Sequence, residues 1–254
     1  MNPDCSLCKI CECTPKKCVP KGTDSPMIYF VGEAPGPEEK EVGIPFVGKA
    51  GKYLMKMLDA FGLNENNCRF FNVVRCYPKK DEGDGFRQPS DDEISNCIIN
   101  VLEDIYNTNP KLIVTLGGTS SKAFLEDEFT RITDDEMHGN LFRIDIEDKS
   151  FNVIPMFHPS YLMRRYNDSD LRSKFKKDLI KAINVASTSS TEAVKYSNHS
   201  AHGRRDFDDD TVLCLTYKDF DEFCKEEIDR SDVTAYDIET NALEKTCADF
   251  KVVG

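Results

Sequence analysis

The sequence predicts an α/β fold with a mainly parallel central sheet covered by helices on both faces. Two observations lead to this prediction. Short apolar runs of strand length alternate with longer stretches whose apolar residues recur at helical spacing. Glycine-rich or polar segments separate them, as the crossover connections of a parallel sheet require. The expected architecture is therefore a three-layer α/β/α sandwich.

Five apolar runs are predicted to be the strands of this sandwich. They span residues 27–31, 69–74, 111–116, 141–146 and 152–156. All have the usual length of a strand in a globular protein. The alternation with helices between them favours parallel pairing for most of the sheet.

Four stretches are predicted to be helices. They begin at Ala50, after Ser90, after Thr119 and at Asp170. Ser90 is a favourable N-cap, and three acidic residues follow it in the first turn, where the helix dipole favours negative charge. Residues 158–160 are predicted to form a turn, and residues 170–186 a final basic helix.

The composition narrows the class of protein. The 254 residues are 39% apolar and 31% charged, which excludes a disordered or low-complexity chain. No run of about 18 apolar residues is present, so we expect no membrane span. The N-terminus lacks the features of a signal peptide, so we expect a soluble, cytoplasmic protein. The net charge of −12 argues against a nucleic-acid partner, but it is concentrated after residue 190, so local patches must decide.

Three segments of different character suggest the domain organisation. Residues 1–186 carry the alternating pattern and are predicted to form one domain. Residues 187–210 are rich in Ser, Thr, His and Asp without periodicity, which is typical of a linker. Residues 211–254 fit a strand, an acidic helix and a strand, too little to close a core alone. We therefore expect the chain to end inside a second domain.

The loop of residues 32–51 is the first candidate for a binding site. Ligands of parallel sheets bind at the carboxyl ends of the strands, where this loop begins. Its glycines let backbone N–H groups approach a ligand, and the helix that starts at Ala50 presents a positive end to an anion. Phe46 is an aromatic residue in a loop where little core is expected. A tight strand-to-helix crossover would need the same glycines, so both interpretations stay open here.

The cysteines indicate a metal site. Five of the eleven fall within residues 5–18, namely Cys5, Cys8, Cys11, Cys13 and Cys18. Disulfides are disfavoured in the cytoplasm, so a metal ion or an iron–sulfur cluster is the first expectation. From spacing alone, a structural Cys₄ zinc site is an alternative.

Four separated motifs resemble those of a known family. They are GEAPG at 32–36, GIPFVGKAG at 43–51, FNVVRC at 71–76 and FHPSYLMRR at 157–165. Together with the cysteines they resemble the family four uracil-DNA glycosylases, the iron–sulfur branch of that superfamily. The resemblance covers about residues 5–186. It implies the three-layer α/β/α fold and the hydrolysis of the N-glycosidic bond of deoxyuridine in DNA after base flipping.

The resemblance implies three side chains that would grip the base. Phe46 would stack on the uracil face, and the Asn72 amide would pair with the uracil edge. His158 would donate to uracil O2 as negative charge builds there. Each has a structural alternative: Phe46 as a core residue, Asn72 as a strand cap and His158 as a turn residue.

Two acids of the first loop are candidates for handling the attacking water. By the resemblance, Glu33 would position or activate the water, or balance the positive charge of the sugar. Glu39 is a second acid in the same loop, and the sequence leaves the choice between them open. The backbone around these acids would bind substrate through Gly32, Ala34 and Gly36.

The last motif is expected to contact the DNA. In the family this loop enters the duplex, so Leu162 and Met163 would supply an apolar wedge for the gap left by the flipped base. Arg164, Arg165 and Lys49 would bind phosphates. Further lysines could add to this patch or form a solvated face: Lys52, Lys174, Lys176 and Lys177.

The resemblance also implies a ligand set for the metal site. Cys5, Cys8, Cys76 and Cys97 would hold a [4Fe–4S] cluster, with zinc as the alternative. Cys11, Cys13 and Cys18 are additional to the family pattern, so an exchange of ligands stays open. The cluster would be structural, because hydrolysis needs no redox step.

The end of the chain carries a separate signal. Asp237 and Glu239 form Asp-x-Glu on a predicted strand, which points both carboxylates to one face, where they could hold divalent ions. The segment resembles the first motif of the 3′–5′ exonuclease domain of DNA polymerase I-like enzymes, a fold of the ribonuclease H-like type. The remaining acidic motifs of that domain are absent, so no cleavage by this segment is expected.

The prediction for function combines these parts. We expect a monomeric uracil-DNA glycosylase that acts on uracil-containing DNA. It would be the N-terminal module of a phage-type DNA polymerase, in the host cytoplasm, with the remainder of the polymerase as a partner. Two alternatives are a non-cleaving module that binds uracil or DNA, and a zinc-stapled structural domain.

Overall fold

The computed structural model describes residues 5, 8, 10, 16–80 and 85–187. The expected linker at 187–210, apart from its first residue, and the expected segment with Asp237 and Glu239 lie outside the described residues, as do Cys11 and Cys13. No helix of the described part is long and apolar enough to cross a membrane.

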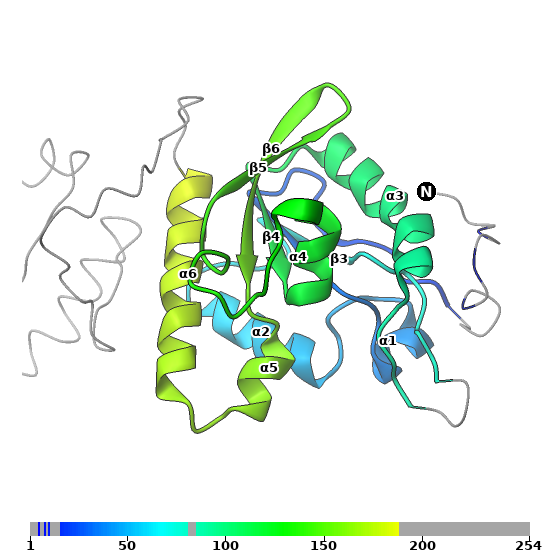
Figure 1. Ribbon diagram of the computed structural model, residues 1–254, viewed down its shortest axis with the longest axis horizontal. Coiled ribbons are helices and arrows are strands. Elements are labelled where there is room, and N and C mark those ends of the chain that lie inside the picture. The colour runs from blue at the N-terminus through cyan, green and yellow to red at the C-terminus, as the bar shows by residue number, and fades with distance from the viewer. Residues whose placement is uncertain (1–4, 6–7, 9, 11–15, 81–84, 188–254) are drawn as a thin grey trace, which may run out of the picture. The chain divides into compact units, whose positions relative to one another are not determined.

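A six-stranded mixed sheet forms the centre of the described part (Figure 1). Its strands are β1 (Lys21–Gly22), β2 (Ile28–Gly32), β3 (Cys68–Asn72), β4 (Leu112–Leu116), β5 (Phe142–Ile146) and β6 (Lys149–Met156). They lie in the order β1-β3-β2-β4-β6-β5. The four inner strands are parallel and the two edge strands antiparallel, so the prediction of a mainly parallel sheet is confirmed.

Helices cover both faces of this sheet. They are α1 (Pro37–Val42), α2 (Lys49–Asp59), α3 (Asp91–Thr108), α4 (Gly118–Leu125), the short 3₁₀ helix η2 (Glu126–Glu128), α5 (Pro159–Arg164) and α6 (Ser169–Ser187). One buried cluster joins α2, α5 and α6 to side chains such as Phe30 and Val114. The other joins α3 and α4 to their strand neighbours, such as Tyr29 and Ile113. Because successive strand residues point to opposite faces, this alternation produces the predicted three layers.

Buried polar side chains tie the sheet to α3. The Arg69 guanidinium on β3 donates to both carboxylate oxygens of Asp104 on α3, at 2.6 and 2.9 Å. The Tyr29 hydroxyl on β2 also donates to Asp104. Burial, followed by the charge of Asp104, raises the pKa of Tyr29 well above its ordinary value. A charge-assisted network of this kind fixes α3 against the central sheet.

The carboxyl ends of the inner strands meet at one edge of the sheet. There β2 leads to Glu33, β3 ends at Asn72, β4 leads to Gly117, and β6 leads to His158. The observed element at 158–160 corrects the predicted turn: His158 is the N-cap of α5, and its ring accepts the N–H of Ser160. Helix α1 was also missed inside the predicted loop 32–51.

Candidate active site

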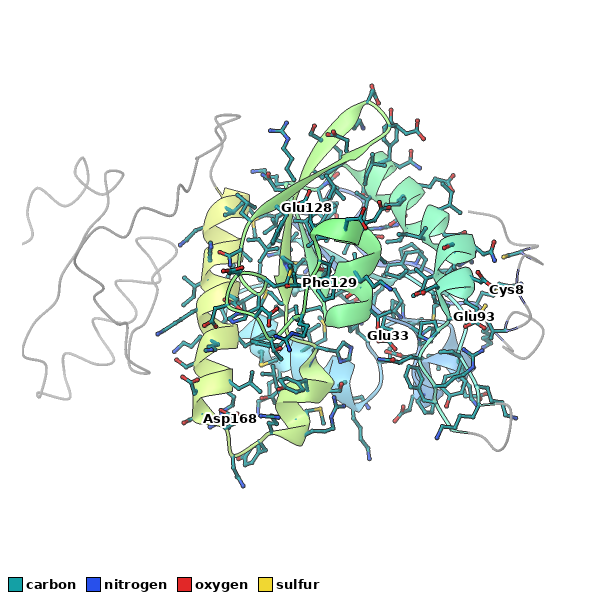
Figure 2. The ribbon with its side chains drawn as sticks, viewed as in Figure 1. Cys8, Glu33, Glu93, Glu128, Phe129 and Asp168 are labelled. Atoms are coloured by element: carbon teal, nitrogen blue, oxygen red, sulfur yellow. The ribbon has the colours of Figure 1, made fainter. Side chains whose placement is uncertain are left out.

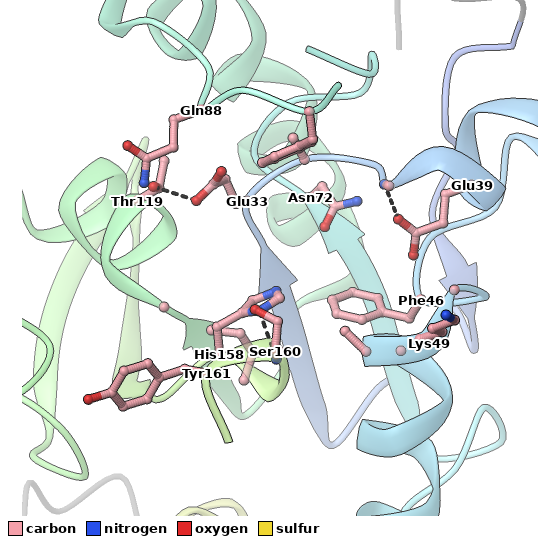
Figure 3. Close-up of a pocket in the computed structure, with 18 of the residues that line it drawn as sticks. Glu33, Glu39, Phe46, Lys49, Asn72, Gln88, Thr119, His158, Ser160 and Tyr161 are labelled. Atoms are coloured by element: carbon pink, nitrogen blue, oxygen red, sulfur yellow. Dashed lines mark hydrogen bonds between the residues drawn. The ribbon is translucent and has the colours of Figure 1, made fainter. Parts of the chain in front are cut away.

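One cavity of about 740 Å³ opens at this edge of the sheet (Figure 3). Its volume is within the usual range for ligand pockets. The side chains predicted to grip a base, Phe46, Asn72 and His158, all line it, together with Glu33. In Figure 3 these four labelled side chains surround a common space. Residues far apart in the sequence therefore converge on one site.

Phe46 lies at the rim of the core and also lines the cavity. Its backbone has a φ of 58°, a left-handed conformation that is uncommon outside glycine. Its ring meets Phe70 edge to face at 5.9 Å between centroids, and only 6% of the residue is exposed. The expectation that an aromatic here has little core to join is therefore wrong. Gly51 makes this loop fit, because a Cβ there would lie 2.2 Å from the Phe46 backbone.

Asn72 is the last residue of β3 and is 3% exposed. Its amide approaches Gly32 on the neighbouring strand so closely that a Cβ on Gly32 would lie 2.3 Å from Asn72 Oδ1. The same Cβ would lie 2.9 Å from Phe46 Cζ. The cavity is lined by Ala34 and Gly36 but not, among the described residues, by Gly32. The missing side chain of Gly32 makes room for Asn72 and Phe46.

His158 is held in one tautomer. Its Nδ1 accepts the backbone N–H of Ser160 at 3.2 Å and lies 2.7 Å from the Ser160 hydroxyl, which accepts from Arg164 in turn at 3.1 Å. Burial, followed by the charge of Arg164, lowers the pKa of His158 to about 4. The ring is therefore neutral at ordinary pH, and because Nδ1 is an acceptor, Nε2 carries the proton. The cavity thus has a neutral imidazole donor.

Glu33 follows β2 and faces the cavity from the opposite side to Phe46 (Figure 3). Burial raises the pKa of its carboxyl, and a hydrogen bond from Thr119 opposes this shift. The Thr119 hydroxyl donates to Glu33 Oε2 at 2.6 Å. One carboxylate oxygen is thereby fixed by the protein.

Glu39 on α1 has different surroundings. Its carboxylate accepts the backbone N–H of Gly36, and the residue is 8% exposed. The backbone N–H groups of Phe46, Val47 and Gly48 also lie close enough to lower its pKa. Burial still raises the pKa of Glu39 against these hydrogen bonds. The carboxylate therefore holds the loop that carries Phe46, which argues against Glu39 as the residue that handles water.

The loop expected to contact DNA is split between core and surface. Leu162 is 1% exposed and packs in the cluster of α2 and α6, so its assignment to the apolar wedge is wrong. Met163, the next residue, is 38% exposed. Arg164 and Arg165 are exposed at the end of α5, and Lys49 is exposed at the start of α2. Lys49 and Arg164 both line the cavity.

The four cysteines expected to bind the cluster are all described. Cys76 and Cys97 are buried, and Cys5 and Cys8 are partly buried. Burial raises the pKa of the Cys97 thiol, the nearby Arg75 lowers it, and the charges of Cys5 and Cys8 raise it. In Figure 2, Cys8 lies near the start of α3, apart from Glu33. No group of three or more potential ligands is close enough to hold a metal ion among the described residues.

The cavity also includes residues to which the sequence assigned no role. Gly118 and Thr119 begin α4, and the segment 117–119 was expected among the ligand-binding loops because it follows a predicted strand, but neither side chain was given a function. Phe86, Gln88 and Ile132 come from irregular segments with no periodicity. Nothing in the sequence pattern indicates them.

A planar ring, a carboxamide and a neutral imidazole donor around one cavity are chemically suited to bind a planar heterocycle and to stabilise negative charge on it. Comparison with known proteins identifies the family. Residues 19–184 match the family model of the uracil DNA glycosylase superfamily. A type-4 uracil-DNA glycosylase of Thermotoga maritima is 36% identical over 70% of this chain and 87% of its own length. The type-4 uracil-DNA glycosylase of Sulfurisphaera tokodaii is 33% identical over 76% of this chain and 84% of its own length.

These matches cover the domain that carries the cavity, and the chain belongs to the uracil-DNA glycosylase superfamily. A DNA polymerase of Bacillus phage SP01 is also similar, at 29% identity over 66% of this chain but only 17% of the polymerase.

Proposed function

We propose that this chain hydrolyses the N-glycosidic bond between uracil and deoxyribose in DNA and leaves an abasic site. The observation that carries the proposal is the convergence of Glu33, Phe46, Asn72 and His158 on one cavity. The type-4 uracil-DNA glycosylases that match most of the domain support the same activity. We assign this activity to the domain formed by residues 1–186.

The base would bind between three side chains after it leaves the duplex. The Phe46 ring supplies a face for stacking, and Phe70 packs against that ring edge to face. The Asn72 amide offers one donor and one acceptor, which match N3–H and O4 of uracil. With the amide held in this orientation, uracil is selected over cytosine, because cytosine presents the opposite pattern on that edge.

Bond cleavage needs stabilisation of the departing anion and of the sugar cation. The Nε2–H of neutral His158 donates to uracil O2, where negative charge grows. The Glu33 carboxylate orients the water that attacks the sugar carbon and balances positive charge on the sugar. Water adds its hydroxyl to that carbon, and its proton ends on the departing base or solvent.

The surface beside the cavity would hold the DNA. Arg164, Arg165 and Lys49 supply positive charge for phosphates, on a protein that is acidic as a whole. Met163 takes the place in the apolar wedge that buried Leu162 cannot take.

We test the activity with a duplex oligonucleotide that carries one uracil. The protein should release uracil and leave an alkali-labile site, whereas a thymine-containing duplex should stay intact. Asn72→Ala should reduce the rate by at least about a hundredfold while the protein stays folded, because the uracil edge loses its partner. Binding of the uracil duplex without any strand break after alkali would contradict the proposal and identify a non-catalytic reader.

We further propose that Cys5, Cys8, Cys76 and Cys97 hold a [4Fe–4S] cluster. Four thiols of the chemically suitable type come from the N-terminal arm, the β3–α3 connection and α3, and the Arg75 backbone N–H donates to Cys97 Sγ at 3.3 Å. Such a donor to a ligand sulfur is typical of cluster sites. The cluster would tie the N-terminal arm to α3 and would take no part in hydrolysis.

The cluster has a direct spectroscopic test. Protein purified without oxygen should be brown and should lose its visible absorbance with dithionite. Cys76→Ser should lose the colour, whereas Cys68→Ser should keep it, because Cys68 is buried on β3, where its thiol lies beside Asn67. A colourless wild-type protein that contains zinc would favour the zinc-stapled alternative.

The similarity to a phage DNA polymerase favours a second element of the proposal. We propose that the glycosylase domain is the N-terminal module of such a polymerase, joined by a linker at residues 187–210. Residues 211–254, with Asp237 and Glu239, would begin its exonuclease-like domain. A non-cleaving DNA-binding module is the alternative in this setting, because cleavage of its own template would harm a polymerase.

A further inference from the structure

Residues 117–119, which are the N-cap and first two residues of α4, line the cavity beside Glu33 and His158 (Figure 3). Gly117 has a φ of +93°, and a Cβ there would lie 3.0 Å from His158 Cβ. Two residues later, Thr119 contacts Glu33. One short segment therefore packs against both the imidazole and the carboxylate.

Several hydroxyl side chains lie around the start of α4. The hydroxyl of Thr119 differs from the others in its hydrogen-bond partner. Thr115 and Ser121 lie 2.9 Å apart through their hydroxyls, and Ser121 also donates to the carbonyl of Gly117 at 2.8 Å. Ser120 donates to the carbonyl of Leu116 at 2.8 Å. These bonds fix the start of α4 to the end of β4. The Thr119 hydroxyl instead reaches Glu33, 86 residues away in sequence, at 2.6 Å.

We propose that Thr119 is a positioning residue for Glu33: its hydroxyl, mounted on the anchored start of α4, holds one carboxylate oxygen so that the other faces the attacking water. This inference rests on the glycosylase activity proposed above and adds a residue that acts through Glu33. A flexible glutamate in a cavity of about 740 Å³ would otherwise have several rotamers to choose from.

The charge state of Glu33 gives the proposal a second consequence. Burial raises the pKa of Glu33, and the Thr119 hydrogen bond lowers it. Other titratable groups also line the cavity: Glu38, Glu39, Lys49, His158, Tyr161 and Arg164. Without the hydroxyl, burial acts unopposed and the carboxylate takes up its proton at a higher pH. The acid limb of the pH–rate profile should then move to higher pH.

The test compares three variants in single-turnover uracil release by the full chain. Thr119→Val keeps the shape of the side chain without the hydroxyl, and we expect its rate at neutral pH to fall by about ten- to a hundredfold. Thr119→Ser restores the hydroxyl and should recover most of the rate. Thr108→Val is the matched control, because the Thr108 hydroxyl donates to the carbonyl of Asp104 at 2.7 Å, outside the cavity. Its rate should equal that of the wild type.

A structural role for Thr119 would give a different result. In a Glu33→Gln background, Thr119→Val should cause little further loss, since residues that act through one another are not additive. Additive losses, or an unshifted acid limb in Thr119→Val, would overturn the proposal while the wild type remains an active glycosylase. An inactive wild type would instead reject the glycosylase activity, and the role of Thr119 with it.

Discussion

Replacing His158 with asparagine is expected to slow uracil release by about a hundred- to a thousandfold, the usual cost of losing a donor to a developing anion. Asparagine is chosen because His158 is also the N-cap of α5, where its ring accepts the N–H of Ser160. An asparagine side chain can take over this capping bond. The variant therefore removes the imidazole donor and keeps the helix start.

His158→Ala separates the two roles of the residue. It should lose the same activity as His158→Asn and, in addition, about 1 kcal/mol of stability, because the cap is lost. Single-turnover rates and thermal unfolding measure the two effects independently. If folded His158→Ala, which has no side-chain donor, released uracil within a few fold of the wild-type rate, the His158 ring would be a structural cap and not the donor to uracil O2.

The same geometry predicts the pH dependence. Since burial and Arg164 lower the pKa of His158 to about 4, the ring stays neutral from about pH 5 upwards. No loss of activity from His158 is therefore expected near pH 6.5, where an ordinary histidine titrates. The effect on stability is different. Between pH 6.5 and pH 4, His158 is protonated in the unfolded chain but stays neutral in the folded protein, because its pKa is lowered from 6.5 to about 4 by folding. The contribution of His158 to the free energy of unfolding therefore falls as the pH drops toward 4.

Much of this site could be predicted because its parts follow strands. Glu33 and His158 follow the carboxyl ends of apolar runs that were visible in the sequence, and Asn72 lies within the predicted run 69–74, where the observed strand β3 ends at Asn72. β4 was predicted to within one residue of its observed start. Parallel pairing then brings these ends to one edge.

Other features depend on contacts that no local pattern records. β1 has two residues, and it forms because Lys21 and Gly22 pair with β3. Which of Leu162 and Met163 is buried depends on the direction in which α5 starts, and the His158 cap sets that direction. Phe46 joins the core through a positive φ that only its neighbours make tolerable.

The choice between Glu33 and Glu39 is where the structure adds most to the sequence. Both carboxyl groups are buried, and burial raises the pKa of each. They differ in their surroundings: Glu33 accepts a hydrogen bond from one hydroxyl, whereas Glu39 accepts the backbone N–H of Gly36 and has the backbone N–H groups of Phe46, Val47 and Gly48 close by. A carboxylate surrounded by backbone N–H groups has little capacity left for a water.

Glutamine substitutions at the two positions should therefore have opposite effects: one should lower the reaction rate and the other the stability. Glu33→Gln should lower the rate by about a hundredfold or more, the usual contribution of a general base, without loss of stability. Glu39→Gln places an NH₂ group against backbone donors and leaves at least one of them unpaired, which should cost about 3 kcal/mol of unfolding free energy. The melting temperature would fall by about 10 °C for a domain of this size. Glu41→Gln, on the exposed side of α1, is the control and should change neither property.

Activity of Glu39→Gln should also fall, but through the position of Phe46. Glu39 holds the Phe46 and Val47 amides, so a loosened loop weakens stacking on the base and should reduce affinity for uracil more than the chemical step. A low temperature that restores the fold should recover part of this loss, whereas no temperature should recover the loss in Glu33→Gln. If Glu39→Gln kept its melting temperature and lost only the chemical step, Glu39 would be the acid that handles water, and Glu33 with its Thr119 partner would be a structural pair.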